Sequence, residues 1–152
     1  MAGRFDGRSG ENGGAGEWTS HAAGRDRPAG DRPNGSPGPC GIDPLFSAPE
    51  PARVAGASVT FEPGARTNWH THPRGQVLIV TEGAGFYQEK GKPAQPIKKG
   101  DVVNIPKNTE HWHGATAKTK MVHIAVTNYK DEQNVVWLKP VSEHEYDLVN
   151  KQ

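Results

Sequence analysis

The sequence predicts an all-β domain, either a sandwich or a barrel, that follows a tail rich in glycine and proline. Two observations lead to this fold class. Short segments of β-branched and aromatic residues recur every 8 to 12 residues or so, with turn signals between them. The only helix signal lies near the end of the chain, where Ser142 and Glu145 have the spacing of a capping box. We therefore expect one short C-terminal helix beside a sheet-based core.

The first 41 residues differ in composition from the rest of the chain. They hold 11 of the 19 glycines and 4 of the 13 prolines, and their only aromatic residues are Phe5 and Trp18. Such a segment buries too little apolar area to offset the conformational entropy lost on ordering. We predict that residues 1–41 are a disordered tail and that residues 42–152 form one domain of ordinary size.

The expected strands follow one another closely through this domain. Residues 57–61 and 76–81 are rich in β-branched and large apolar residues, and each segment ends at a glycine-containing turn, the second at 82–85. Residues 86–89 and 94–97 flank a Lys-Gly-Lys-Pro turn and predict a hairpin. Further strands are expected at residues 68–72, 102–105, 121–127 and 135–139.

Charge and composition exclude several classes of partner. The net charge is +1, and the 5 arginines of the tail are balanced by 5 acidic residues, so no basic surface for nucleic acid or an anionic membrane is indicated. No apolar run reaches ~18 residues, and no secretory signal is evident. The single Cys40 cannot form an internal disulfide. We expect a cytoplasmic protein that binds neither nucleic acid nor a membrane.

Histidines gather in two pairs with the same spacing. His70 and His72 lie two residues apart in an expected strand, so both imidazoles point to one face, and Gln76 can return beside them after a turn. His111 and His113 repeat the spacing further along. Because imidazole is the commonest ligand of transition metals, the two pairs predict a site for one divalent metal ion.

Two segments around these residues resemble the two motifs of the cupin family. The pattern Gly64-(x5)-His70-x-His72-(x3)-Gln76-(x6)-Gly83 is similar to the first motif, in which Glu usually stands in place of Gln76. The pattern Gly100-(x5)-Pro106-x-Asn108-(x2)-His111 is similar to the second, although Asn108 replaces the usual Gly and Ala115 the final Asn. The resemblance implies a double-stranded β-helix, or jelly-roll barrel. Its metal would be held by His70, His72, Gln76 and His111.

A narrower likeness concerns bacterial cupins that are manganese-dependent (R)-hydroxynitrile lyases. It rests on the segments Ile42-Asp43-Pro44-Leu45-Phe46, Thr60-Phe61-Glu62-Pro63-Gly64-Ala65-Arg66-Thr67, Trp69-His70-Thr71-His72-Pro73 and His111-Trp112-His113-Gly114-Ala115. That group also uses three His and one Gln, so Gln76 matches it. Arg74, Val77 and Thr127 depart from it, and Thr127 stands where these lyases carry Gln. The likeness implies reversible cleavage of a cyanohydrin into a carbonyl compound and cyanide.

The neutral Gln76 affects the expected chemistry. With three His and Gln, a divalent ion keeps a charge of about +2, which makes it a stronger Lewis acid than with Glu. Four protein ligands on a six-coordinate ion leave two open positions, as in catalytic sites. The resemblance favours Mn²⁺, whereas the ligand types also accommodate Fe²⁺, Co²⁺, Ni²⁺ and Zn²⁺.

His123 is the candidate catalytic base. It lies in the alternating segment 121–127 and shares a face with Ala125 and Thr127. An ordinary imidazole, with a pKa of about 6.5, suits proton transfer near neutral pH. The matching position of the resembling lyases is their proposed base. The alternatives are that His123 supports a ligand or faces outward, and the same two alternatives hold for His113.

Other readings of the domain stay open. With Fe²⁺ the same residues would suit a dioxygenase, and a non-catalytic barrel could bind metal and a small ligand. The substrate is expected to be a small molecule. Exposed sheet edges and outer faces predict a homodimer or homotetramer. Trp69, Trp112 and Trp137 either fill the core or wall the pocket, and core is the expectation for each.

Overall fold

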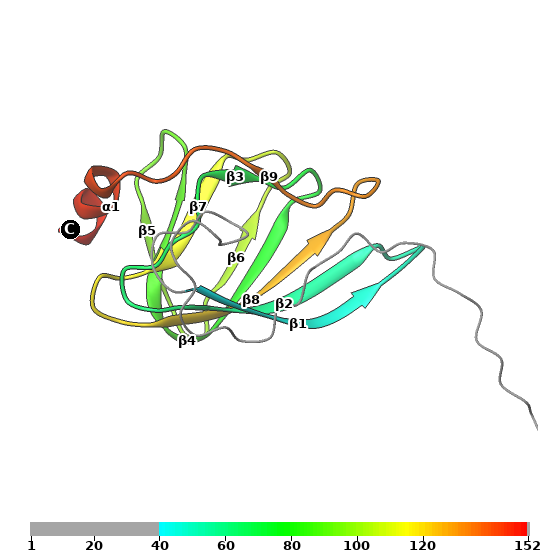
Figure 1. Cartoon of the computed structure of the whole chain (residues 1–152), viewed down its shortest axis with the longest axis horizontal. Helices are drawn as coiled ribbons and strands as arrows, with labels where there is room; N and C mark the ends of the chain where they lie inside the picture. The colour runs from blue at the N-terminus through cyan, green and yellow to red at the C-terminus, as the bar shows by residue number, and fades with distance from the viewer. Residues whose placement is uncertain (1–39, 152) are drawn as a thin grey trace, which may run out of the picture.

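The computed structural model describes residues 40–151, which form antiparallel strands and one C-terminal helix (Figure 1). In chain order the elements are β1 (Cys40–Ala48), β2 (Val54–Phe61), β3 (His70–Thr71), β4 (Gln76–Glu89), β5 (Gln95–Lys98), β6 (Val102–Ile105), β7 (His111–Ala115), β8 (Met121–Asn128), β9 (Val136–Trp137) and α1 (Glu143–Asn150). No helix within this part of the chain is long and apolar enough to cross a membrane.

The strands form two facing layers that share β4. Hydrogen-bonded neighbours follow the order β1-β2-β8-β4-β7-β3-β9, and β5 and β6 also pair with β4. The start of β4 pairs with β6 and β8, and its end pairs with β5 and β7. We call β1, β2, β8, β6 and the start of β4 the first sheet, and the end of β4 with β5, β7, β3 and β9 the second sheet. The predicted jelly-roll architecture is confirmed, as a curled sheet closed over a core (Figure 1).

The turn predicted at residues 82–85 is wrong. The chain continues there as one strand, and its register with β8 shifts between Val80 and Glu82. Gly83 has a positive φ of 71°, and an added Cβ would collide with the backbone of Lys120. The glycines therefore mark a bend with a bulge at which β4 passes from the first sheet to the second.

β1 extends the domain at its N-terminal side beyond the predicted start at Ile42. The strand begins at Cys40, which is opposite Phe61 of β2, and its pairing contains a bulge between Pro44 and Phe46. The expected strand list lacked β1, because Pro44 and the bulge interrupt any regular alternation. Of the tail predicted to be disordered, residues 1–41, the last two belong to β1, and residues 1–39 lie outside the described residues.

The core has two parts. The first lies between the sheets and joins residues of both, including Phe61, Leu78, Tyr87 and Met121. The second lies under α1 and contains Trp69, Trp112, Val141, Tyr146 and Val149. The core position expected for Trp69 and Trp112 is thus observed, whereas Trp137 of β9 is 40% exposed, and the expectation was wrong for it.

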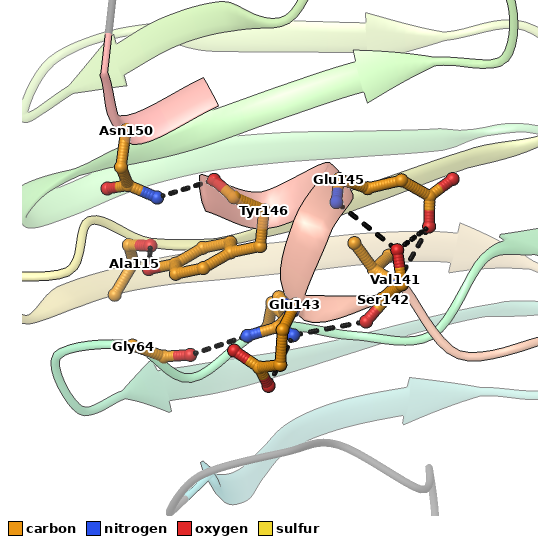
Figure 2. Close-up of polar contacts among 9 residues, drawn as sticks. Gly64, Ala115, Val141, Ser142, Glu143, Glu145, Tyr146 and Asn150 are labelled. Carbon is orange, nitrogen blue, oxygen red and sulfur yellow. Dashed lines mark hydrogen bonds and ion pairs between the residues drawn. The ribbon is translucent and has the colours of Figure 1, made fainter. Parts of the chain in front are cut away.

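Polar contacts fasten α1 to the barrel (Figure 2). The Ser142 hydroxyl accepts a hydrogen bond from the Glu145 backbone, and the Glu145 carboxylate accepts one in return, so the predicted capping box is present. The buried Arg66 guanidinium donates to the Val141 carbonyl at 3.1 Å and lies 4.2 Å from the centroid of the Tyr146 ring. These contacts hold the helix over the second part of the core, away from the site described below.

Candidate metal centre

Side chains alternate between the two faces of a strand, and on three strands this alternation points histidines into the interior of the barrel. His70 on β3 is opposite His111 on β7, and His113 follows two residues later on the same face of β7. Trp112, between them, points the other way, into the core under α1. His123 comes from β8 of the facing first sheet. These side chains and that of His72 are all buried.

Backbone carbonyls fix the orientation of the three predicted ligand histidines. Nδ1 of His70 lies 2.8 Å from the Asn68 carbonyl oxygen, Nδ1 of His111 lies 2.7 Å from that of Thr109, and Nδ1 of His72 lies 2.5 Å from that of Asn134. A carbonyl oxygen only accepts, so each Nδ1 carries the proton and donates it. Each Nε2 is therefore left unprotonated, as a metal ligand requires.

Three further polar atoms of the predicted set are buried without a partner. Nε2 of His72, Nε2 of His111 and Oε1 of Gln76 make no hydrogen bond. Gln76 lies next to His72, and its side chain partly offsets the lowering of the pKa of that imidazole by burial. A buried acceptor without a donor is costly, and a bound cation would satisfy these acceptors together. The donor set thus fits a divalent metal ion.

The rings converge closely. The centroids of His70 and His111 are 4.2 Å apart, and those of His70 and His72 are 5.0 Å apart. His113 also approaches, because one nitrogen from each of His70, His111 and His113 lies within 4.8 Å of the others. The structure therefore brings the predicted His70, His72, Gln76 and His111 together, and adds His113 to them.

Burial keeps these imidazoles neutral. Desolvation, with smaller contributions from neighbouring histidines, holds the pKa of His70 well below its ordinary value. Burial lowers the pKa of His111 to about 4 and lowers that of His72, although the Asn134 carbonyl opposes the shift for His72. At neutral pH all three are in the form that binds a metal ion.

His123 and His113 form a buried pair beside this cluster. His123 Nε2 lies 3.1 Å from His113 Nδ1, and His123 Nδ1 makes no hydrogen bond. The His123 ring also packs against Phe61, with centroids 5.5 Å apart. Burial lowers the pKa of His123 to about 4, so the ordinary pKa expected for this residue was wrong. Both histidines face inward, which rejects the outward alternative for each.

A cavity of about 990 Å³ opens beside the histidines. Its wall includes His70, His72, Gln76, His113 and His123, together with the small side chains of Ala55, Ala57 and Ala125. Trp137 stands at the wall, with its ring centroid 4.8 Å from that of His70. The cavity is therefore polar where the histidines converge and mostly apolar elsewhere, the usual character of a small-molecule site.

Two polar residues of this wall were not singled out as site residues from the sequence. Asn134 holds His72 through its backbone carbonyl, and its side-chain amide donates to the Thr127 hydroxyl at 3.3 Å. Thr127 is itself opposite Gln76 in the first sheet. No sequence signal marks Asn134, because its contact with His72 depends on how the loop before β9 folds back.

The fold and the site define a class of protein: an all-β barrel in which buried imidazoles converge beside a cavity and could hold a metal ion. The family model described as "Cupin domain" matches residues 57–127, which include all the histidines above. An (R)-mandelonitrile lyase from Granulicella tundricola is 54% identical over 105 residues, which cover 69% of this chain and 80% of that protein. The chain belongs to the cupin family.

Solved structures agree with this assignment. A cupin-like protein from Thermotoga maritima is 46% identical, with a TM-score of 0.72, over 76% of this chain and 88% of that one. A polyketide cyclase from Streptomyces resistomycificus is 18% identical, with a TM-score of 0.56, over 71% and 76% of the two chains. The second similarity concerns the fold alone.

Proposed function

We propose that this cupin is a metal-dependent lyase that cleaves cyanohydrins reversibly into a carbonyl compound and cyanide. One observation supports it above the others. Three histidines, each held by a backbone carbonyl at Nδ1, converge with one neutral amide beside a mostly apolar cavity. Next to them lies the buried His123, which is not needed as a metal ligand. The 54% identity with a protein named (R)-mandelonitrile lyase supports the choice of reaction.

His70, His72, Gln76 and His111 would hold the ion, which we propose to be Mn²⁺. Fe²⁺, Co²⁺, Ni²⁺ and Zn²⁺ are compatible with the same nitrogen and oxygen donors. When bound, the ion supplies Lewis acidity that makes a nearby hydroxyl group more acidic and favours an anion. Gln76 adds no negative charge, so the protein leaves that positive charge undiminished.

His123 would take the hydroxyl proton of the cyanohydrin. In the tautomer that donates from Nε2 to His113 Nδ1, the partnerless His123 Nδ1 is the nitrogen that accepts. The imidazolium that results keeps its hydrogen bond to His113. The electrons of the O–H bond then form the carbonyl double bond, and the C–CN bond breaks with its electrons on the leaving cyanide. Returning the proton to cyanide completes the balance.

The apolar wall suits the organic part of a small cyanohydrin. Ala55, Ala57 and Ala125 leave room beside the histidines, and Trp137 offers an aromatic surface.

We place the reaction in the cytoplasm, as expected from the sequence.

The test combines metal analysis with an activity assay. Protein purified without added metal is analysed for its elements, and mandelonitrile cleavage is followed by benzaldehyde release in that metal form. We expect one divalent ion per chain and an activity that is lost on chelation and restored by the metal. Unchanged cleavage after complete removal of the ion would refute the proposal. Oxygen uptake with catechols or flavonols, without cyanide release, would indicate a dioxygenase instead.

A further inference from the structure

The side-chain amide of Asn134 has hydrogen-bonding groups that the fold does not use. Asn134 is 8% exposed and lies in the wall of the cavity, next to Thr127. One N–H of the amide is donated to the Thr127 hydroxyl at 3.3 Å. The second N–H and the amide oxygen have no hydrogen-bond partner among the described residues. A polar group that is buried to this extent usually has a partner, and a ligand in the cavity could supply it.

The chain on both sides of Asn134 holds this amide in place. The preceding turn is closed by two backbone hydrogen bonds between Lys130 and Gln133, at 2.9 and 3.1 Å. The Asn134 backbone carbonyl accepts from His72, and Val136, two residues further on, pairs with β3 in the second sheet. A recognition group that is fixed in this way has little freedom to lose on binding, which favours affinity.

Strand β8 separates this amide from His123. Three side chains of β8 face the interior in turn, those of His123, Ala125 and Thr127. The loop that follows β8, orange in Figure 1, brings Asn134 back to Thr127. Four residues of strand span about 13 Å, so Thr127 lies roughly that far from His123. A cyanohydrin carries its hydroxyl and nitrile groups on one carbon, so a molecule whose hydroxyl meets His123 can reach Asn134 only with another part of its structure.

The wall between these two polar ends is lined by small apolar side chains. Ala125 is opposite Ala57 on β2, and Ala55 is opposite Thr127. Trp137 adds an aromatic surface from the second sheet. Two hydrogen bonds of about 2.8 Å each take up part of the distance and leave about 7 Å between the two groups of a ligand that are bound. A single aromatic ring with a polar substituent opposite the reacting carbon spans this length.

Charged residues of the cavity wall distinguish between possible substituents. The acidic side chains of the wall are those of Glu50, Asp131 and Glu132, and the last two precede Asn134 closely in the chain. Arg53 of the same wall is paired with Glu50. This excess of acidic side chains repels a carboxylate or a phosphate. The amide offers both a donor and an acceptor, and an uncharged hydroxyl group matches them because it can accept and donate in return.

We propose that Asn134, held by Thr127, recognises an uncharged hydroxyl group at the far end of the substrate and so determines specificity. The substrate class is then an aromatic cyanohydrin with a hydroxyl group opposite the reacting carbon, as in 4-hydroxymandelonitrile. The inference rests on the proposed lyase activity, because His123 and the metal site fix the other end of the molecule. The hydrogen bond is remote from the reacting atoms, so it stabilises the bound substrate and the transition state equally and acts on KM rather than on kcat.

The test compares cleavage of 4-hydroxymandelonitrile and mandelonitrile by the full-length wild type and Asn134→Leu, with metal in excess. Leucine is of similar size and cannot form the hydrogen bonds, and it keeps the backbone carbonyl that holds His72. We expect the wild type to prefer the hydroxylated substrate about tenfold in kcat/KM, the value of one hydrogen bond, through a lower KM. The preference should disappear in Asn134→Leu and persist in the matched control Asn104→Leu, which makes the same change at an exposed position of β6.

A binding measurement separates this inference from the proposed function. Calorimetry with 4-hydroxybenzaldehyde and benzaldehyde measures recognition of the hydroxyl group without turnover. Tighter binding of 4-hydroxybenzaldehyde by the wild type than by Asn134→Leu, with no cleavage of either cyanohydrin, would refute the lyase activity and support the recognition. A wild type that distinguishes neither the two cyanohydrins nor the two aldehydes, or a preference unchanged in Asn134→Leu, would overturn the role of Asn134. Asn134→Ala takes the place of the leucine variant if circular dichroism shows that the latter does not fold.

Discussion

Backbone carbonyl oxygens act at the scale of single residues here, because each one selects a tautomer. Once Asn68, Thr109 and Asn134 have taken the Nδ1 protons, the imidazoles they hold have only one nitrogen left for a metal. The barrel therefore presents a prepared set of acceptors rather than histidines that must rotate and lose a proton on binding. Preparation of this kind raises affinity, because little reorganisation remains.

Removing a single imidazole should empty the site. We expect His70→Ala, His72→Ala and His111→Ala each to lose the bound ion, because the remaining donors no longer surround it. Elemental analysis of each purified variant gives the measurement. His144→Ala, which removes an exposed imidazole from α1, is the control and should keep one ion per chain. Full metal content in all three site variants would show that the ion is held elsewhere.

The Thr127 hydroxyl should influence the metal without touching it. Thr127→Val removes the acceptor for the Asn134 amide and so loosens the loop whose carbonyl holds His72. We expect metal affinity to fall by about 10- to 100-fold, the usual effect of losing an outer-shell partner. Competition with a chelator measures it, and Thr60→Val on the outward side of β2 is the control. Equal affinity in both variants would separate Asn134 from the site.

His123 should matter for turnover rather than for metal content. If it takes the cyanohydrin proton, His123→Ala should keep the ion and lose about 10²-fold or more in kcat. Because burial lowers the pKa of His123 to about 4, its neutral form dominates throughout the neutral range, and kcat should not rise between pH 6 and 8 on its account. A metal-loaded His123→Ala enzyme with near wild-type mandelonitrile cleavage would make His123 a supporting residue only.

At this scale the sequence predicted which residues form the site better than it predicted the burial and contacts of their side chains. The two His-x-His pairs and Gln76 could be grouped because strand alternation and one turn suffice to bring them together. The pKa of His123 could not be predicted, since it depends on burial against Phe61 and His113 from other strands. Nor could the exposure of Trp137, because β9 lies at the edge of the second sheet.

At the scale of elements, α1 is held by its cap as much as by its packing. Ser142→Ala removes the acceptor for the Glu145 backbone and leaves that N–H without its partner. We expect the free energy of unfolding to fall by about 1 kcal/mol, the usual value of a lost helix cap. Urea denaturation measures it, with Ser47→Ala on the exposed part of β1 as the control. A loss no larger than that of the control would show that the Arg66 contacts suffice.

Local pattern predicted most elements. β7 was absent from the expected strands although its pairing is regular, and the two other misses share one cause. The segment 102–105 was predicted with its observed bounds, because Val-Val-Asn-Ile lies between a turn and a proline. β1 was missed and β4 was divided in two, because both contain bulges. A bulge places proline or glycine inside a strand, and those residues indicate a turn when only neighbours in sequence are considered.

At the scale of the whole molecule, the buried histidines couple folding to pH. Burial lowers the pKa of His111 and of His123 to about 4, against roughly 6.5 in an unfolded chain. The unfolded state therefore binds more protons between these values, so stability is complete above about pH 6.5 and decreases as the pH falls towards 4. Each such histidine contributes a slope of at most about 1.4 kcal/mol per pH unit.

Thermal melts of the metal-free protein test this coupling. We expect the Tm to fall steadily from pH 7 to pH 5, while a metal-loaded sample keeps a higher Tm at neutral pH. His144→Ala should follow the wild-type curve, because its imidazole is exposed. A Tm independent of pH over this window would mean that the buried histidines are not neutral in the folded protein.

Because β4 belongs to both sheets, the residues of the site are synthesised at different times. Gln76 lies at the start of β4, but its strand neighbours, on β6 and β8, are synthesised later, and Asn134 later still. A growing chain emerging from the ribosome therefore exposes His70, His72 and Gln76 before anything can enclose them. With pairings this distant in sequence, closure is slow compared with a hairpin. The proposed metal site is therefore complete only after Asn134, whose carbonyl holds His72, has been synthesised.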